Sequence, residues 1–388
     1  MVANYIKSVC FSQISKLMLF IAVLTILAGC NTNRQIEWIS PYKDIDWDNV
    51  IQAKAQFHAH TTVSDGWLAP HAVVETYKKL GYQVLALTDH WHVTYPWTEF
   101  SDLEPSGGTY RRLEAGEMEG YSTDDILVFE DRDPDLLGMV AIPGAEPSHT
   151  GAGEHHLVSL FSGVTGSGLG FRETLDAIEE ARGLVSFAHP GRDTEWNNNT
   201  VEDYIYYFDR YEQLYGLDIF TSYTITRQNE RWERCFSLVS DLLNHYGLYG
   251  TDNWRPVWLT STDDMHRPNE YHSGFQIQLL NKLDKENVYK SLKDGAFFWV
   301  AQAHGEEPPL ISSVQFDGSR IIVSGEGYDR IAWYSGNKVI HEGDVFDLLR
   351  NGYDDLFYLF FVAHTSDFSL EYQTGSLIGS QPIWVVRQ

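Results

Sequence analysis

Cysteine is scarce in this chain, with only 3 among its 388 residues. Cys10 and Cys30 lie within the first thirty residues, so Cys235 is the one thiol in the rest of the sequence. One thiol cannot form an intramolecular disulfide, which excludes a scaffold stapled by such bonds. Cys235 falls in a stretch with helical spacing, 231–246, where we expect a buried structural thiol.

Positive charge is also in short supply. The chain has 28 Lys and Arg against 54 Asp and Glu, which gives a formal net charge of −26. A protein that binds duplex nucleic acid carries a basic face, so this balance argues against such a partner. A phosphorylated substrate is still compatible with it, because bound cations can reverse the local field. With 43% hydrophobic residues, the chain can form a large core and two or three domains.

Only one long hydrophobic run stands out, at residues 17–29. Its length of about 13 residues is too short to cross a bilayer comfortably. Lys7 and Lys16 precede it, which is typical of a secretory signal. We therefore expect residues 1–29 to be a signal peptide and 30–50 a polar tether.

The apolar run ends in Leu27-Ala28-Gly29-Cys30, which resembles the bacterial lipobox. The resemblance implies that Cys30 becomes the lipidated first residue of an exported lipoprotein, held to the membrane by its lipid alone. Asn31 stands where an aspartate would signal retention at the inner membrane, so we expect the outer membrane. The alternative is an ordinary signal peptide with an incidental cysteine.

From Gln52 onward the sequence alternates between strand and helix patterns. The expected strands end at polar residues, and they are separated by helical stretches such as 70–80 and 171–182. In parallel α/β folds the active site lies at the carboxyl ends of the strands. Because the polar residues are spread widely along the chain and must meet at one point, a barrel of about seven βα units over 51–305 is favoured over an open sheet.

Two regions depart from this regular pattern. Residues 91–138 have no clear period, and they are interpreted as a lid over the site or as a surface excursion. Residues 306–388 contain short alternating strands separated by glycine-rich turns. We expect them to form a small antiparallel β domain that resembles a sandwich.

The expected strand ends carry a set of imidazoles and carboxylates, the ligands that hold Zn, Fe or Mn ions. In His58-x-His60 both side chains lie on the same face of a strand, because strand side chains alternate. Glu146 is a carboxylate and can bridge two ions. Nine residues make up the candidate set: His58, His60, Asp65, His90, Glu146, His156, His189, Asp264 and His266.

These motifs resemble those of the polymerase and histidinol phosphatase (PHP) family. The match includes Ser64-Asp65-Gly66, Thr88-Asp89-His90, Gly144-x-Glu146 and Ala188-His189-Pro190, and covers roughly residues 52–270. The resemblance implies a distorted (βα)7 barrel with two or three divalent ions, Zn, Mn or Fe. It assigns one ion to His58, His60, Glu146 and Asp264, a second to Glu146, His156 and His189, and a third to Asp65, His90 and His266. The doubled pairs Asp263-Asp264 and His155-His156 leave the register at these two places open.

The implied activity is hydrolysis of a phosphate ester by a hydroxide that the ions generate from water. Asp89 is expected behind the ligands or as a proton carrier. Arg192 is expected either to clamp a phosphate oxygen or to be a surface arginine. The substrate is expected to be small and phosphorylated, and Trp67, Trp91, Trp97 and Trp196 leave a nucleotide open because aromatic rings can stack on a base. From the sequence, a protein partner is unknown.

Two other functions compete with this interpretation. An amidohydrolase-like enzyme also begins with His-x-His, but it commonly uses a later carboxylated lysine and a lone final aspartate. The final Asp264-x-His266 favours the phosphoesterase. A non-catalytic lipoprotein that binds a metal or glycan is the third hypothesis, and the complete ligand set argues against it.

Overall fold

The computed structural model describes residues 36–191, 199–221, 228–303, 306–350, 353–366, 369 and 374–387. The chain forms a large unit, Trp38–Val385, and a small unit of the residues that flank it, 1–37 and 386–388. Strands β1 (Ile36–Ile39) and β18 (Ile383–Arg387) contain the described residues of the small unit. The expected signal peptide and Cys30 lie outside the described residues, as do Arg192 and Trp196.

Seven strands lie next to one another in sequence order and form one end of the main sheet. They are β2 (Ile51–Gln56), β3 (Val84–Leu87), β4 (Val140–Ala145), β5 (Leu157–Leu160), β6 (Leu184–Phe187), β7 (Leu214–Thr221) and β8 (Trp258–Thr262). Each pairs with the next, and all pairs are parallel except those of β5, which runs antiparallel to both β4 and β6. β3, β5, β6, β7 and β8 are buried along their whole length, as expected for strands covered on both faces.

The last of these strands returns to the first just beyond their carboxyl ends. Ala59 and Met265 form a parallel bridge, and the His60 amide donates to the Met265 carbonyl over 2.8 Å. The Trp67 amide donates to the His266 carbonyl over the same distance. Segments that follow β2 and β8 are therefore hydrogen-bonded side by side.

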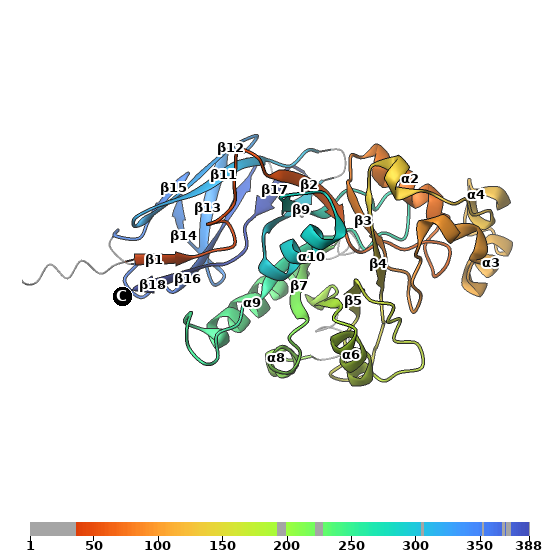
Figure 1. Cartoon of the computed structure of the whole chain (residues 1–388), viewed down its shortest axis with the longest axis horizontal. Coiled ribbons are helices and arrows are strands. Elements are labelled where there is room, and N and C mark those ends of the chain that lie inside the picture. The colour runs from red at the N-terminus through yellow and green to blue at the C-terminus, as the bar shows by residue number, and fades with distance from the viewer. Residues whose placement is uncertain are drawn as a thin grey trace, which may run out of the picture. The chain divides into compact units, whose positions relative to one another are not determined.

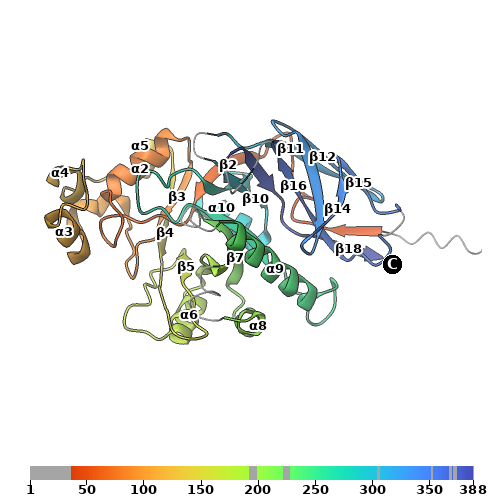
Figure 2. The same ribbon diagram turned by 180° about the vertical axis from the view of Figure 1, so that it is seen from behind.

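Helices connect most of these strands (Figures 1 and 2). They are α2 (Pro70–Lys79), α6 (Phe171–Glu180), α8 (Val201–Arg210) and α9 (Gln228–Tyr246). The β3–β4 connection instead carries the 3-10 helix η1 (Trp97–Asp102) and the short helices α3 (Gly107–Glu114), α4 (Thr123–Leu127) and α5 (Pro134–Leu137). The described β4–β5 connection has no helix, so the expectation of an unbroken βα repeat is wrong at this point. An antiparallel pair needs no helical crossover, because its strands run in opposite directions.

The chain then adds an antiparallel region. β9 (Gly274–Leu280) pairs with β2, and after α10 (Lys285–Asp294) the strand β10 (Phe297–Gln302) pairs with β9. β13 (Arg330–Ser335), β14 (Lys338–Glu342), β16 (Tyr358–His364) and β17 (Ser376–Gly379) extend this sheet, and β18 also pairs with β16. β11 (Leu310–Asp317), β12 (Arg320–Glu326) and β15 (Val345–Asp347) form a separate antiparallel sheet.

Aromatic side chains hold the antiparallel region together. Trp333 on β13 packs against Phe346 on β15, with ring centroids 5.3 Å apart, and thereby joins the two sheets. A Cβ on Gly379 would come within 2.0 Å of the Trp299 ring, so only glycine leaves room for this indole. The small antiparallel β region expected near the C-terminus is thus present.

The residues expected to be a tether are partly packed into the large unit. Tyr42 is buried, and its hydroxyl donates to the Phe297 carbonyl over 2.9 Å. The Gln381 amide donates to the same hydroxyl over 2.7 Å. The segment that holds Tyr42 is therefore attached to the body, because an aromatic ring with a satisfied hydroxyl is well suited to burial.

Candidate metal centre

The nine candidate side chains converge in the structure. They form three groups whose donor atoms lie within 4.8 Å of one another. The first group is His58, His60, Glu146 and Asp264; the second is Glu146, His156 and His189; the third is His60, Asp65, His90 and His266. His60 belongs to two groups, and so does Glu146, so the three groups form one continuous cluster.

Glu146 lies at the centre of this cluster. Its Oε2 lies 2.8 Å from His90 Nδ1, 3.2 Å from His60 Nε2 and 3.3 Å from His58 Nε2. Its Oε1 lies 2.9 Å from His156 Nδ1 and 3.3 Å from His189 Nε2. The two carboxylate oxygens therefore face different sets of imidazoles, as a bridging ligand would.

The direction of β5 explains how His156 reaches the cluster. His156 precedes β5, whereas the other candidates follow strands or lie in the loops after them. Because β5 runs against its neighbours, its amino end lies at the same edge of the sheet as their carboxyl ends. Its neighbour His155 is buried elsewhere, 4.5 Å from the Phe187 ring, and Asn199 Nδ2 lies 3.0 Å from its Nδ1.

A tight loop brings Asp65 to the third group. Asp65 Oδ1 lies 3.4 Å from His266 Nε2, 3.6 Å from His90 Nε2 and 3.7 Å from His60 Nδ1. A Cβ on Gly66 would lie 2.6 Å from the His60 carbonyl, so the turn from His60 to Asp65 requires glycine there.

Of the doubled pair Asp263-Asp264, it is Asp264 that faces the cluster. Asp264 Oδ1 lies 3.2 Å from Nε2 of both His58 and His60. Asp263 instead accepts the backbone amides of Ser273 and Gly274 and the hydroxyl of Tyr77. Burial raises the pKa of Asp263 to about 6, even though these donors lower it.

Burial and charge oppose each other throughout the cluster. Burial raises the pKa of Glu146 and Asp264, but the neighbouring imidazoles outweigh it and hold both pKa values well below the usual range. Burial lowers the pKa of His58, but Asp264 and Glu146 outweigh it and raise that pKa well above its ordinary value. The carboxylates are thus kept ionised in a buried place, where they attract cations.

The buried donor atoms support the same conclusion. His58 Nε2, His60 Nε2, Glu146 Oε2 and Asp264 Oδ2 are buried and make no hydrogen bond within the described part of the chain. Buried polar groups are normally satisfied, and leaving several unsatisfied in one place is unfavourable. Divalent cations would satisfy these atoms, so the residues fit a multinuclear metal site.

The structure also reveals Asp218, which the sequence analysis missed. Asp218 Oδ2 lies 3.7 Å from His58 Nδ1, on the side of the ring away from the cluster. Thr262 Oγ1 donates to the same oxygen over 2.8 Å, and Thr260 donates to the other oxygen. A carboxylate behind a ligating imidazole fixes the orientation of the ring. The signal in the sequence is a lone aspartate within the apolar strand β7.

Asp89 lies behind the loop that carries Asp65. It is fully buried and accepts hydrogen bonds from the amide and hydroxyl of Thr61 and from the hydroxyl of Ser64, at 2.7 to 2.8 Å. Thr94 also donates to it over 2.5 Å. Among the described residues no ion pair joins Asp89 to the nine candidates.

A cavity of about 440 Å³ opens onto the cluster. Seven of the nine candidates line it, all except His58 and His60, together with Trp67, Arg112, Glu117, Thr150, Arg267 and Glu270. Arg112 belongs to α3, so the irregular insertion at 91–138 contributes a side chain to the wall of this cavity. Trp97 is fully buried and does not line the cavity.

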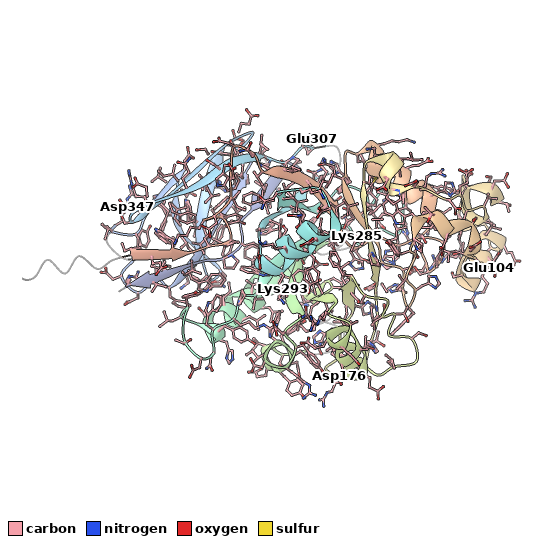
Figure 3. The ribbon with its side chains drawn as sticks, viewed as in Figure 1. Glu104, Asp176, Lys285, Lys293, Glu307 and Asp347 are labelled. Atoms are coloured by element: carbon pink, nitrogen blue, oxygen red, sulfur yellow. The ribbon has the colours of Figure 1, made fainter. Side chains whose placement is uncertain are left out.

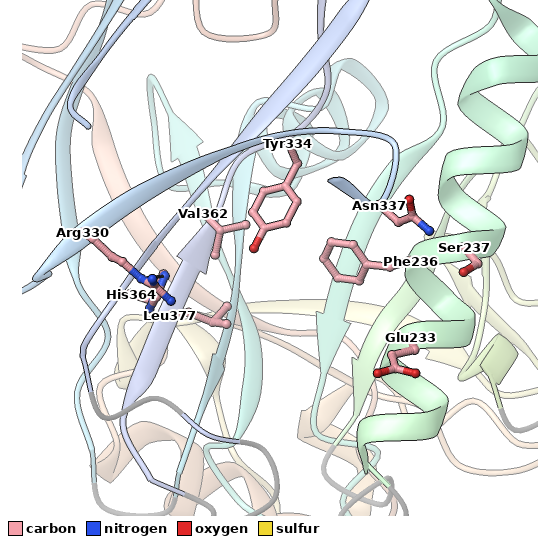
Figure 4. A pocket seen from close by; sticks show the side chains of 9 residues that line it. All are labelled: Glu233, Phe236, Ser237, Arg330, Tyr334, Asn337, Val362, His364 and Leu377. Atoms are coloured by element: carbon pink, nitrogen blue, oxygen red, sulfur yellow. Dashed lines mark hydrogen bonds between the residues drawn. The ribbon is translucent and has the colours of Figure 1, made fainter. Parts of the chain in front are cut away.

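A second cavity, of about 390 Å³, lies between α9 and the sheet of β13, β16 and β17. Figure 4 shows Arg330 beside His364 on one side and Phe236 on the other. Arg330 Nε donates to His364 Nε2 over 2.6 Å, and Arg330 Nη1 lies 3.5 Å from Glu342 Oε1. The Arg330 guanidinium thus already has partners. None of the residues of the three metal-ligand groups lines this second cavity.

No family model and no curated protein matches this sequence. Among solved structures, the chain is similar to a two-domain protein from Bacteroides vulgatus that contains a predicted PHP-like metal-dependent phosphoesterase. This similarity has a TM-score of 0.44 at 12% identity, over 89% of this chain and 97% of that one.

The chain is also similar to an amidohydrolase from Chromobacterium violaceum with bound sulfate and no metal. The TM-score is 0.34 at 15% identity, over 56% of this chain and 89% of that one. TM-scores below 0.5 do not by themselves decide between these activities, so the functional assignment rests on the geometry of the site.

Proposed function

We propose that this protein is a metal-dependent phosphoesterase of the PHP type, which hydrolyses a small phosphorylated substrate. The observation that carries the proposal is the central position of Glu146, whose two oxygens face separate sets of imidazoles. This arrangement suits two or three ions held close together, with Zn, Mn and Fe all compatible with the donors.

The three groups would hold the ions as follows. The group of His58, His60, Glu146 and Asp264 offers four fully buried donors, and the pair His156 and His189 shares Glu146 with it. The group around Asp65 is less buried, so its ion would be the most accessible from the cavity. Divalent ions in such a site lower the pKa of a bound water and neutralise charge that develops at phosphorus.

The surrounding residues would keep this geometry rigid. Asp218 Oδ2 lies 3.7 Å from His58 Nδ1, where it would orient this ring once a metal is bound, and the His266 ring is held with its Nδ1 2.9 Å from the Asp264 carbonyl, which leaves Nε2 facing Asp65. Ser148 Oγ lies 2.5 Å from His90 Nδ1. Ligands whose rings are fixed in advance need little reorganisation when the transition state forms.

A direct experiment is hydrolysis of p-nitrophenyl phosphate by the full chain after incubation with Mn²⁺, Zn²⁺ or Fe²⁺ and after treatment with a chelator. We expect turnover that requires the metal and that falls about 1,000-fold or more in Glu146→Gln, because the bridging charge is lost. Glu180→Gln, at an exposed site on α6, serves as the matched control. Turnover that survives both chelation and Glu146→Gln would refute the proposal.

The same preparation separates the competing functions. An amidohydrolase-like enzyme would hydrolyse amide or lactone substrates and leave p-nitrophenyl phosphate intact. A non-catalytic binding protein would take up metal and turn over neither class. The second cavity favours neither alternative, since Arg330 is already paired with Glu342 and hydrogen-bonded to His364.

We further propose that the protein is exported and anchored through a lipid on Cys30, on the basis of Leu27-Ala28-Gly29-Cys30. A search of the described residues found no helix with the length and apolar character of a membrane span. Expression of the full chain in a bacterial host, with membrane fractionation and mass spectrometry, tests the anchor. Wild type should carry lipid on its N-terminal cysteine, whereas Cys30→Ala should leave the membrane fraction.

A further inference from the structure

Two arginines that line the metal cavity, Arg112 and Arg267, form no ion pair with a carboxylate within the part of the chain that the structure describes. Arg132, Arg210 and Arg320 each lie within 4.0 Å of a carboxylate. Among the described residues, no such ion pair forms for Arg112 or Arg267, although both line the cavity with Glu117 and Glu270.

Arg112 is held in place by the docking of α3 on the loop that carries Asp65. Ser106 caps α3 by accepting the Thr109 amide over 3.1 Å, and the Ser106 amide donates to the Thr62 carbonyl over 2.8 Å. Thr109 Oγ1 donates to the same carbonyl over 3.0 Å. Arg112 itself donates through one nitrogen to the Asp65 carbonyl. A guanidinium has five N–H donors, and Arg112 uses one nitrogen for this hydrogen bond among the described residues, so other donors can face a ligand.

Arg267 reaches the same side of the cavity from a different segment. It follows His266, and its guanidinium lies 5.3 Å from the centre of the Trp67 ring. The Trp67 amide donates to the His266 carbonyl over 2.8 Å, which fixes the two segments together. Both arginines therefore contact the Asp65–Trp67 segment, next to the group of His60, Asp65, His90 and His266.

We infer that Arg112 and Arg267 form an anion-binding subsite that selects phosphate monoesters over diesters, an inference that rests on the proposed function. The three carboxylates among the nine donors do not neutralise two or three divalent ions, and the arginines add further positive charge on the Asp65 side. A monoester dianion has three oxygens besides the ester oxygen, so it can contact the ions and still present one to a guanidinium. A diester has only two oxygens that carry no carbon substituent, and the oxygen that would face the guanidinium is an ester oxygen.

Binding of phenylphosphonate and of its monomethyl ester tests this inference without turnover. Phenylphosphonate has no ester bond. Its monomethyl ester differs at one oxygen, which carries a methyl group in place of a negative charge, and its single P–O–C bond has methoxide as a poor leaving group. Titration calorimetry on the metal-loaded full chain should show tighter binding of phenylphosphonate. In Arg112→Gln and Arg267→Gln its affinity should fall by about 10- to 100-fold, the usual effect of losing a hydrogen bond to a charged group, while that of the monomethyl ester changes less than about 3-fold.

Arg320→Gln, on β12 and outside the cavity, removes the same charge and should change neither affinity. Arg112→Gln also removes a contact with the Asp65 carbonyl, so Arg267→Gln, which makes no such contact, guards against a disturbed loop. Circular dichroism melting checks that each variant is folded.

The outcomes separate this inference from the proposed function. Equal losses for both ligands, or no loss in either variant, would overturn the inference even if p-nitrophenyl phosphate is turned over. Arginine-dependent preference for phenylphosphonate in a protein without turnover would support the subsite and remove the catalytic proposal. A wild type that binds both ligands equally would also overturn the subsite.

Discussion

The carboxyl edge of strands β2 to β8 and the antiparallel region from β10 to β18 bury very different side chains. At the first, five imidazoles and carboxylates are buried to at least 97%, namely His58, His60, Glu146, His189 and Asp264. At the second, the largest buried side chains are Trp299, Trp333, Trp384 and Tyr358, and the indole nitrogens of Trp299 and Trp333 donate to backbone carbonyls. Charged residues such as Glu104, Asp176 and Glu307 lie at the exposed surface instead (Figure 3).

This difference indicates that the carboxyl edge needs bound cations, whereas the antiparallel region does not. In the antiparallel region the large buried side chains are aromatic, and the indole nitrogens of Trp299 and Trp333 donate to backbone carbonyls, so its stability follows mainly from packing and area burial. The carboxyl edge buries His58 Nε2, His60 Nε2, Glu146 Oε2 and Asp264 Oδ2, which make no hydrogen bond to any described residue. Substitutions should therefore divide into two classes, those that lose metal and turnover and those that lose stability.

The largest effect on function is expected for His60→Ala. His60 belongs to two of the three groups, so its loss should disrupt two metal positions and reduce turnover of p-nitrophenyl phosphate by at least about 1,000-fold. Unfolding of the metal-free chain in urea should change little, because the side chain buries no large apolar surface. His245→Ala, at an exposed position on α9, is the control. Full turnover in a folded His60→Ala protein would contradict the division of substitutions into these two classes.

The opposite behaviour is expected for Trp333→Ala in the antiparallel region. Removing a fully buried indole that packs on Phe346 should lower the free energy of unfolding by about 3–5 kcal/mol. Urea denaturation measures this loss. The molecules that remain folded should keep their bound metal and kcat, and a variant of normal stability that lacks metal would contradict the division into two classes.

A smaller effect is expected for Asp218→Asn, which lies between the two classes. The amide cannot hold His58 as the carboxylate does, so metal affinity or turnover should fall by about 10- to 100-fold. Competition with a chromogenic chelator measures the affinity. Asp176→Asn, at an exposed site on α6, should leave it unchanged, and an unchanged affinity in Asp218→Asn would mean that the carboxylate does not orient the ring.

The smallest effect concerns the pH dependence of stability through His364. Burial lowers the pKa of His364, and Arg330 lowers it further against the opposing effect of the Thr365 carbonyl. The unfolded chain, with a histidine pKa of about 6.5, then binds more protons than the native chain below that pH, so stability falls on acidification through this window. Urea unfolding at several pH values should show a shallower fall in His364→Asn. Identical slopes in both proteins would exclude the contribution.

The nine candidate residues could be found from the sequence because ligands of one centre leave closely spaced motifs at strand ends. His58-x-His60 and Asp264-x-His266 follow the alternation of a strand, which is a local property. Asp218 and Arg112 leave no such trace, since each acts across a distance that only the folded chain sets. Asp89 accepts four hydrogen bonds from Thr61, Ser64 and Thr94, and its expected role, behind the ligands or as a proton carrier, stays a prediction.

The sequence predicts the alternation of strands and helices, but it does not predict where the structure departs from that alternation. The helices α2 and α6 were expected within two residues of their observed ends, because proline and glycine punctuate them. The antiparallel direction of β5 could not be seen, because a short buried run such as Leu157–Leu160 has the same apolar character in either direction. β9 and β10 are also absent from the expected strands; they pair with each other, but their other partners, β2 and β17, lie far away in the sequence.

The most direct test of the central claim is the number of divalent ions bound by the full chain, measured by native mass spectrometry after loading with Mn²⁺ or Zn²⁺ and removal of excess metal. The shared positions of His60 and Glu146 predict two or three ions in the wild type and at least one fewer in Glu146→Gln. One ion or none in the wild type, or an unchanged number in the variant, would contradict the account.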